Sequence, residues 1–291
     1  MIRESATAEL TAWSGGGRTP RAWRSGFLGR RTGAVGALLC APMVLLGLGA
    51  LFMDPWHTTS IAGPALLPPS GAHLMGTDAL GRDLLRGMIL GAQTSLLVSA
   101  AVGVISFAIG AAVGTLAGYH GGRVDDLLMR GTEFFQVIPR FFLAIMAIAL
   151  FGPGVEYVIL VLGVSSWPLL ARVIRAEVLV LMELDFVRAA RAAGASAPRI
   201  VFRELLPNAL PAALVMLGLL MGQVILIESS LSFIGLGDPA RVSWGGLAGV
   251  ANPFLRVAWW MPLFPGLAIA ATVLGCNLLA DAATDALGEE R

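Results

Sequence analysis

The sequence predicts an all-α integral membrane protein with six transmembrane helices and both termini in the cytoplasm. The first observation behind this fold class is composition. Of the 291 residues, 56% are hydrophobic and only 13% are charged, which is about half the charged fraction of soluble domains. The second is that six apolar stretches approach the ~20 residues that a helix needs to cross a bilayer. The third is an uneven distribution of arginine between the segments that separate these stretches.

The six apolar stretches follow one another along the chain as candidate spans. They cover residues 34–53, 95–118, 134–151, 155–170, 209–227 and 257–280. The third is interrupted near its start by Gln136, Pro139 and Arg140, and a Gly-Pro-Gly turn at residues 152–154 then reverses the chain. The first stretch is about 20 residues long and follows a leader of about 32 residues. Both lengths exceed those of a signal peptide, so we expect a retained span.

The distribution of arginine predicts how the spans are oriented across the membrane. Fifteen of the twenty arginines fall in one alternating set of segments and four in the other, with Arg140 at a boundary. An excess of positive charge marks the cytoplasmic side. The chain then divides into a cytoplasmic tail (1–32), a first transmembrane helix (33–53), an extracytoplasmic segment (54–94) and a five-helix core (95–285). The core contains a second extracytoplasmic segment (228–256). We expect a multi-pass protein of the plasma membrane.

The sequence lacks the residues that several classes of function require. The chain contains no lysine, whereas a phosphate-cradling loop requires G-x-x-x-x-G-K-[ST]. Any ATP that drives the protein must therefore bind to another subunit. G-x-S-x-G, H-E-x-x-H and C-x-x-C are absent, so we expect no catalytic residues, and three scattered histidines predict no metal site. Cys40 and Cys276 lie in apolar runs and are interpreted as packing cysteines. The net charge of +1 gives no sign of a nucleic-acid partner.

Two spans carry glycines four residues apart. These are Gly110, Gly114 and Gly118 in the second span, and Gly218 and Gly222 in the fifth. Small residues at this spacing allow helix backbones to approach closely in lipid. The pattern fits either ordinary packing in a bundle or a sliding surface in a bundle that moves.

Ionisable groups are absent from the middle of the spans. A carrier coupled to ions usually keeps such groups near the midplane, so a secondary transporter is disfavoured. Glu228 lies at the outer end of span five, close to Ser229 and Gln223, and Trp244 follows in a glycine-rich segment. We assign these four residues to the translocation path or outer gate. Glu228 is interpreted either as solvated at the interface or as lining an outward-facing vestibule.

The stretch RAARAAGASAPRIVFRELLPN (188–208) is a charged interruption between two spans. Asp185 is a plausible N-cap for a helix over 186–193, and Gly194 supplies a C-terminal break. Ser196 can cap a second short helix, which we expect to end at residues 205–207, before span five. The product is a helical knob on the cytoplasmic surface. It would either rest on anionic lipid or, since its faces are mostly alanine, dock into a groove of another protein.

The knob carries a family resemblance. FVRAARAAGASAPRIVFRELLPNALP is similar to the EAA loop of ATP-binding-cassette importer permeases, E-A-A-x3-G-x9-I-x-L-P. The residues that match in register are Ala189, Ala190, Gly194, Leu206 and Pro207. Arg188 stands where the pattern has Glu, and Glu204 where it has Ile. HLMGTDALGRDLLRGMILGAQTSL and ESSLSFIGLGDPARVSWGGL resemble the C-type permease subunit of the peptide/nickel branch. The resemblance covers roughly residues 70–288.

The resemblance implies a type I importer permease fold and a peptide importer. Its coupling loop (185–207) would contact an ATPase subunit through Arg188, Ala189, Ala190, Arg191, Gly194, Ala195, Leu206 and Pro207. The implied partners are a homologous second permease, two nucleotide-binding subunits that carry ATP and Mg, an extracytoplasmic substrate-binding protein and membrane lipid. A nickel or other small-solute importer is the alternative within the branch. A secondary carrier or channel is the alternative outside it.

Overall fold

The computed structural model describes residues 31–53 and 60–288, and all regular elements in these ranges are helices. In chain order they are α3 (Arg31–Gly49), η1 (Ala50–Phe52), α5 (Leu84–His120), α6 (Gly122–Val137), α7 (Arg140–Phe151), α8 (Val155–Met182), α9 (Asp185–Ala192), α10 (Ala197–Arg199), η2 (Ile200–Leu205), α11 (Leu206–Phe233), α12 (Trp244–Ala251), η3 (Asn252–Phe254) and α13 (Trp260–Gly288). The all-α fold class is confirmed. Most of the predicted tail (1–32), and residues 54–59 of the first extracytoplasmic segment, lie outside the described residues.

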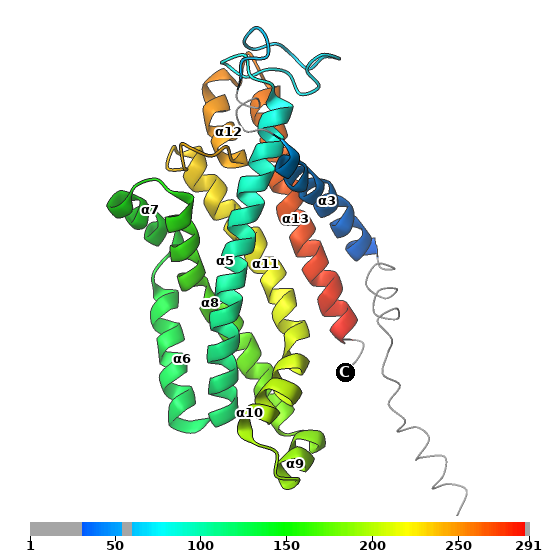
Figure 1. Cartoon of the computed structure of the whole chain (residues 1–291), viewed down its shortest axis with the longest axis vertical. Coiled ribbons are helices and arrows are strands. Elements are labelled where there is room, and N and C mark those ends of the chain that lie inside the picture. The colour runs from blue at the N-terminus through cyan, green and yellow to red at the C-terminus, as the bar shows by residue number, and fades with distance from the viewer. Residues whose placement is uncertain (1–30, 54–59, 289–291) are drawn as a thin grey trace, which may run out of the picture.

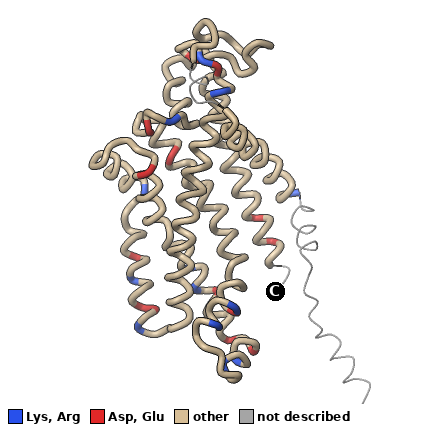
Figure 2. Tube along the Cα trace, viewed as in Figure 1, with Lys and Arg blue, Asp and Glu red and all other residues tan. Residues whose placement is uncertain are grey.

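The long helices form one elongated bundle (Figure 1). Helix α5 runs along its length and packs against α8 and α11, while α3 and α13 pack against each other on one side. Helices α9 and α10 lie at one end with the α5–α6 turn. Residues 60–83 and α12 lie at the opposite end. Charged residues gather at these two ends and are sparse between them (Figure 2). This distribution suits a bundle that crosses hydrocarbon.

Five helices are long and apolar enough to cross a membrane, and α6 with α7 forms a sixth, bent candidate. The predicted third span (134–151) is not one straight helix, because the chain is broken between α6 and α7. The axes of α6 and α7 differ by 73°, and the chain between them is extended at Ile138 (ψ 120°) and Pro139 (ψ 121°). Proline disfavours helical backbone in the preceding residue, so it separates the two helices.

The other spans are longer than predicted. Helix α5 begins at Leu84, so residues 84–94 of the predicted extracytoplasmic segment are helical. Asp83 caps this helix by accepting a hydrogen bond from the backbone N–H of Arg86 (3.3 Å). Helix α8 extends to Met182 rather than 170, and α11 to Phe233 rather than 227. Residues 228–233 of the predicted second extracytoplasmic segment (228–256) are therefore helical, and Glu228 lies inside a helix.

The glycine stripe of α5 lies against α8. A Cβ placed on Gly110 would lie 2.7 Å from the Cβ of Leu170, and one on Gly118 would lie 2.8 Å from Cγ1 of Val178. Between them, a Cβ on Gly114 would clash with the carbonyl oxygen of Ala171. The predicted close approach of backbones is confirmed for this pair of helices.

The second glycine pair behaves differently. A Cβ on Gly218 or Gly222 would have no neighbour closer than 3.6 Å, an ordinary van der Waals separation. The tight contact of α13 is instead with α3. There, a Cβ on Gly36 would lie 3.0 Å from the carbonyl oxygen of Gly275, and Cys40 fills the notch at Gly275. Sequence spacing did not reveal this contact, because the two glycines are on different helices.

Candidate functional sites

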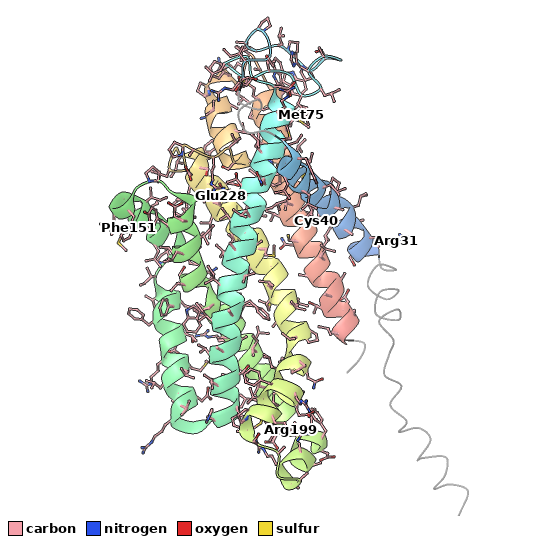
Figure 3. The ribbon with its side chains drawn as sticks, in the orientation of Figure 1. Arg31, Cys40, Met75, Phe151, Arg199 and Glu228 are labelled. Atoms are coloured by element: carbon pink, nitrogen blue, oxygen red, sulfur yellow. The ribbon has the colours of Figure 1, made fainter. Side chains whose placement is uncertain are left out.

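The segment around α9 is anchored to the bundle by one apolar face. Val187, Ile200 and Leu205 are at most 2% exposed. They pack with residues of α8 and α11, such as Ile174 and Ala209, in a single apolar cluster. The predicted helical knob therefore exists, and it is held at one end of the molecule (Figure 3, near Arg199).

The opposite face of this segment is exposed. Arg188, Ala189, Arg191 and Gly194 are exposed, and so are Ala192 and Ala193. This leaves a surface of small side chains with two guanidinium groups beside it. A surface with so little side-chain bulk lets another backbone approach closely.

Two of the predicted coupling residues face the bundle instead. Ala190 and Ala195 are partly buried and pack against the apolar cluster that holds Val187. Leu206 is also partly buried, whereas Pro207 is exposed. A bulky substitution at Ala190 would therefore disturb the packing of the chain itself.

The two arginines of α9 contact their own chain. Arg188 Nη2 donates to Glu183 Oε2 (2.6 Å), in an ion pair that is largely exposed. Arg191 Nη2 lies 3.0 Å from the sulfur of Met182, and its guanidinium lies 5.8 Å from the ring centroid of Tyr119 in α5. The sequence did not predict these partners. Both arginines retain donors that point to solvent, because guanidinium has five N–H groups.

Gly194 ends α9 with a left-handed backbone (φ 76°). The N–H of Ala195 donates to the carbonyl of Ala190 (3.0 Å), and the N–H of Gly194 donates to that of Arg191 (3.0 Å). This pair of bonds is a Schellman motif, which usually requires glycine at the left-handed position. The predicted glycine break is confirmed. The helix begins at Asp185 itself, with Leu184 as its N-cap rather than Asp185.

The second short helix does not end where predicted. From Ala197 the chain runs without a break through α10, the π-helix η2 and α11, so an end at residues 205–207 is wrong. Pro207 sits in the first α-helical turn after η2, a position at which the absence of an N–H is tolerated. The π-helix is a wider turn that changes the path of the backbone without ending the helix.

A second candidate site surrounds Glu228 at the other end of the bundle (Figure 3). Glu228 is only 4% exposed. Its Oε2 accepts a hydrogen bond from Ser95 Oγ of α5 (3.0 Å), and its Oε1 accepts one from Ser232 Oγ (2.8 Å). Ser229 Oγ is 3.5 Å from Oε2. The prediction that Glu228 is solvated at the interface is wrong for this structure.

Trp244 is fully buried beside this cluster. Its Nε1 donates to the carbonyl of Met88 (3.1 Å), and its backbone N–H donates weakly to Ser95 Oγ (3.4 Å). The structure therefore brings together Glu228, Ser229 and Trp244 of the predicted outer gate. It does not bring Gln223 to them: that side chain is exposed on another part of α11.

Sequence reasoning missed Ser95, although a signal was present. Ser95, Ser99 and Ser106 are hydroxyls in an otherwise apolar helix, and all three are fully buried. Ser99 donates to the carbonyl of Met221 and Ser106 to that of Gly163, each at 2.9 Å. Hydroxyls in a span often bond across helices, so their spacing could have indicated the buried face of α5.

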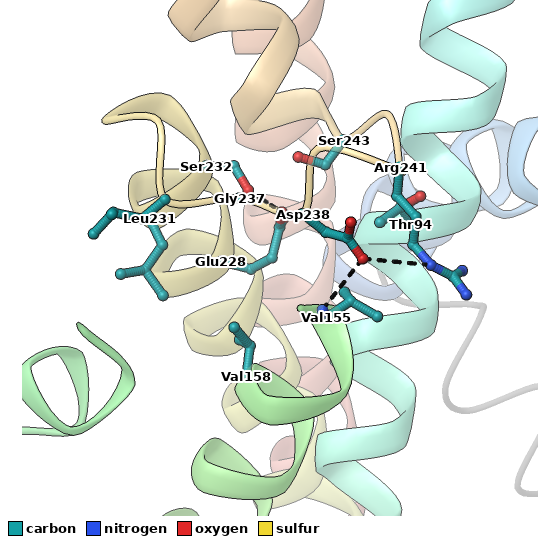
Figure 4. Close-up of a pocket in the computed structure, with 11 residues that line it drawn as sticks. Thr94, Val155, Val158, Glu228, Leu231, Ser232, Gly237, Asp238, Arg241 and Ser243 are labelled. Carbon is teal, nitrogen blue, oxygen red and sulfur yellow. Dashed lines mark hydrogen bonds and ion pairs between the residues drawn. The ribbon is translucent and has the colours of Figure 1, made fainter. Parts of the chain in front are cut away.

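A pocket opens beside Glu228 (Figure 4). It is a small hollow, with a volume of about 20 Å³ for water-sized molecules, and it is lined by residues of α5, α8, α11 and the segment before α12. Asp238 Oδ2 accepts a hydrogen bond from the N–H of Val155 (3.4 Å) and lies 3.9 Å from Arg241 Nε. Asp238 thus ties the start of α8 to this segment. Among the described residues, no three His, Cys, Asp or Glu side chains gather as a metal site.

Comparisons with known proteins agree with this architecture. The family described as "Binding-protein-dependent transport system inner membrane component" matches residues 110–290, a range that holds both candidate sites apart from Ser95 and Met88. The chain is 40% identical over 223 residues to a dipeptide transport system permease protein of Bacillus subtilis, covering 76% of this chain and 70% of the relative.

Two further relatives span nearly the whole chain. A di/tripeptide transport system permease protein of Pseudomonas aeruginosa is 36% identical over 277 residues, covering 91% of this chain and 90% of the relative. An oligopeptide transport system permease protein of Bacillus subtilis is 32% identical over 270 residues, covering 91% and 88%. This chain is a multi-pass protein of the inner membrane, and it belongs to the family of binding-protein-dependent transport system inner membrane components.

Proposed function

We propose that this chain is the transmembrane permease subunit of an ATP-driven importer for dipeptides or oligopeptides. The printed names of its relatives support the substrate class. In this proposal the chain does no chemistry itself. It forms part of the translocation path with a homologous second permease, and it receives peptide from an extracytoplasmic substrate-binding protein. Two nucleotide-binding subunits bind ATP and Mg.

The observation that carries the proposal is the exposed, small-residue surface of α9. Its buried face is fastened to α8 and α11 through Val187 and Leu205, so a push on the exposed face moves these helices. Docked in a groove of the ATPase subunit, α9 would transmit the closure of the ATPase dimer to the bundle. Alternating access between two packed arrangements then moves substrate. In this proposal the α9 end and both termini face the cytoplasm.

The test is peptide uptake and ATPase activity of the assembled transporter with Ala189→Trp. Ala189 is exposed, so the bulky ring meets the docking groove rather than the chain's own packing. We expect assembly to persist while uptake, and the stimulation of ATPase activity by liganded binding protein, are lost. Ala189→Ser, which keeps a small side chain, is the matched control. Normal coupling in Ala189→Trp would contradict docking through α9.

Substrate class is tested separately. The transporter purified with its partners should carry peptide as co-purified ligand, identified by mass spectrometry. If nickel or another small solute co-purified in place of peptide, the chain would be the permease of an importer for that solute instead. The role of α9 would stand in either case.

A further inference from the structure

Glu228 connects three elements that are distant in the sequence. Its carboxylate lies on α11, Ser95 comes from α5, and Trp244 opens α12. Each carboxylate oxygen has a hydroxyl partner within 3.0 Å, and Ser95 Oγ is shared between Glu228 and the backbone N–H of Trp244. The carboxylate therefore links α11 directly to α5, and it reaches α12 through the shared hydroxyl of Ser95.

Because the Glu228 carboxylate is buried, this arrangement is sensitive to the loss of its hydrogen-bond donors. Among the described residues, no arginine lies within ion-pair distance of the Glu228 carboxylate, which hydroxyl donors alone satisfy. A buried carboxylate without these donors would bear an uncompensated desolvation cost. Moving any one partner away from the carboxylate would break a hydrogen bond to a buried charge, so we expect the three elements to keep this arrangement.

Close backbone contacts hold α12 on the same helices. A Cβ on Gly91 of α5 would lie 2.8 Å from the ring of Trp244. A Cβ on Gly245 would lie 2.5 Å from Cα of Ser229, and one on Gly249 would lie 2.5 Å from the carbonyl oxygen of Phe233. Because the atoms at these three points are already in close contact, a displacement of α12 must move the ends of α5 and α11.

Helices α5 and α11 continue to the opposite end of the bundle (Figure 1). There, Tyr119 of α5 lies under the guanidinium of Arg191 in α9. Ala209 of α11 packs in the cluster that holds Val187 of α9. The outer element α12 and the inner element α9 are thus joined by the same two helices.

We propose that Glu228 is a positioning residue that couples the extracytoplasmic surface to the ATPase-facing surface. It fastens α12 to α5 and α11, so that docking of the liganded binding protein against the α12 end shifts both helices and, through them, α9. This inference rests on the proposed function. Glu228 is also among the residues that line the neighbouring pocket, but both of its carboxylate oxygens bond to serines of this chain.

The test uses the complete transporter in lipid nanodiscs and measures ATP hydrolysis with and without liganded binding protein. Glu228→Ala should keep basal hydrolysis and lose stimulation by about fivefold or more, the lower end of typical coupling between sites. Glu228→Gln should retain most of the stimulation, because an amide can accept from one hydroxyl and donate to the other. This rescue separates hydrogen-bonded positioning from a simple loss of fold.

Ser230→Ala is the matched control. Ser230 is exposed on the same helix and donates only to the carbonyl of Leu226 (2.7 Å), so its stimulation should equal that of the wild type. If Glu228→Ala does not assemble, Ser95→Ala removes the one hydroxyl that joins α5 to Glu228 and to the backbone N–H of Trp244, and it should lower stimulation in an assembled complex.

Full stimulation in an assembled Glu228→Ala or Ser95→Ala complex overturns the inference. If Glu228→Gln loses as much stimulation of ATP hydrolysis as Glu228→Ala does, hydrogen bonding by Glu228 is not the basis of the coupling. A wild-type complex that is not stimulated by any liganded binding protein would instead overturn the proposed function, and this inference with it.

Discussion

At the scale of single residues, α9 departs from the EAA pattern in a way that its contacts explain. Arg188 occupies the position of the pattern's Glu and pairs with Glu183 of its own chain. Both partners are largely exposed, so the pair contributes at most about 1 kcal/mol. It orients Arg188 without burying it, and the arginine remains free to meet an acidic group on the ATPase subunit in the proposed complex.

Gly194 provides the first prediction. Its φ of 76° is a conformation that a residue with a Cβ rarely adopts. Gly194→Leu should strain the end of α9 by about 1–2 kcal/mol and abolish uptake, while the protein stays folded in the membrane. Gly194→Asn should retain much of the activity, since asparagine tolerates the left-handed region. Uptake and stimulated ATPase activity in the assembled transporter measure the effect. Wild-type uptake by Gly194→Leu would contradict the prediction.

At the scale of elements, the helix pairs differ in how closely they pack. The pair α5–α8 meets backbone to backbone along three glycines, whereas α11 meets α13 at ordinary distances near Gly218 and Gly222. Interlocked helices resist sliding, and helices at ordinary separation slide more easily. The sliding surface considered for span five therefore fits α11 and α13 better than it fits α5 and α8.

A matched pair of glycines tests the tight α5–α8 contact. Gly114→Ala places a methyl group against the carbonyl oxygen of Ala171 and 3.0 Å from the Cβ of Ile174, which should destabilise the protein by about 1–3 kcal/mol. Gly131→Ala is the same chemical change in a helix, with no atom within 4 Å. It should leave stability equal or slightly raised. Thermal unfolding in detergent compares the two. Equal melting temperatures would show that α5 and α8 do not pack as described.

The contact between α3 and α13 is tested by the two native cysteines. Cys40 Sγ lies 3.8 Å from the carbonyl oxygen of Thr272, and it packs against Gly275, the residue that precedes Cys276 in α13. A short thiol-to-thiol cross-linker in membranes should join them within one chain, as detected by mass spectrometry of the linked peptides. Cys276→Ser should abolish the product. Cross-links found only between chains would contradict the packing of α3 on its own bundle.

At the scale of the whole molecule, most charged residues lie toward the two ends (Figure 2). The sides carry many exposed apolar residues, including Phe134, Leu150 and Leu267. Lipid and, in the proposed complex, a second permease would cover them. The chain thus presents one surface to each aqueous compartment, and only the bundle connects these surfaces.

The last prediction concerns nucleotide. The isolated chain should bind no ATP, because it has no lysine and no phosphate-binding loop. Photo-crosslinking with an azido-ATP analogue should label the nucleotide-binding subunits of the assembled complex and leave this chain unlabelled. Specific labelling of the isolated chain would contradict the assignment of ATP binding to partner subunits.

The tertiary structure corrected several interpretations that were local in origin. Pro139 separates α6 from α7, and the residue before it, Ile138, is extended (ψ 120°), whereas the helix continues through Pro207, and the residue before it, Leu206, is helical (ψ −47°). The same residue type has opposite outcomes, decided by the backbone that surrounds it. Likewise, the sequence places Glu228 at the outer end of span five, but α11 continues past Glu228, which is buried.

The membrane class, five of the six candidate spans, the glycine break at Gly194 and the family resemblance follow from the sequence alone. These properties depend on composition, on local backbone preference or on short-range spacing, all of which one segment carries alone. The folded chain, by contrast, is needed to see that Ser95 meets Glu228, that Gly36 meets Gly275, and that Ala190 faces inward while Ala189 faces out. Such contacts join residues on different helices, and in a uniformly apolar chain the hydrophobic pattern does not say which face meets which neighbour. That choice is made by packing and by the need to satisfy each buried polar group.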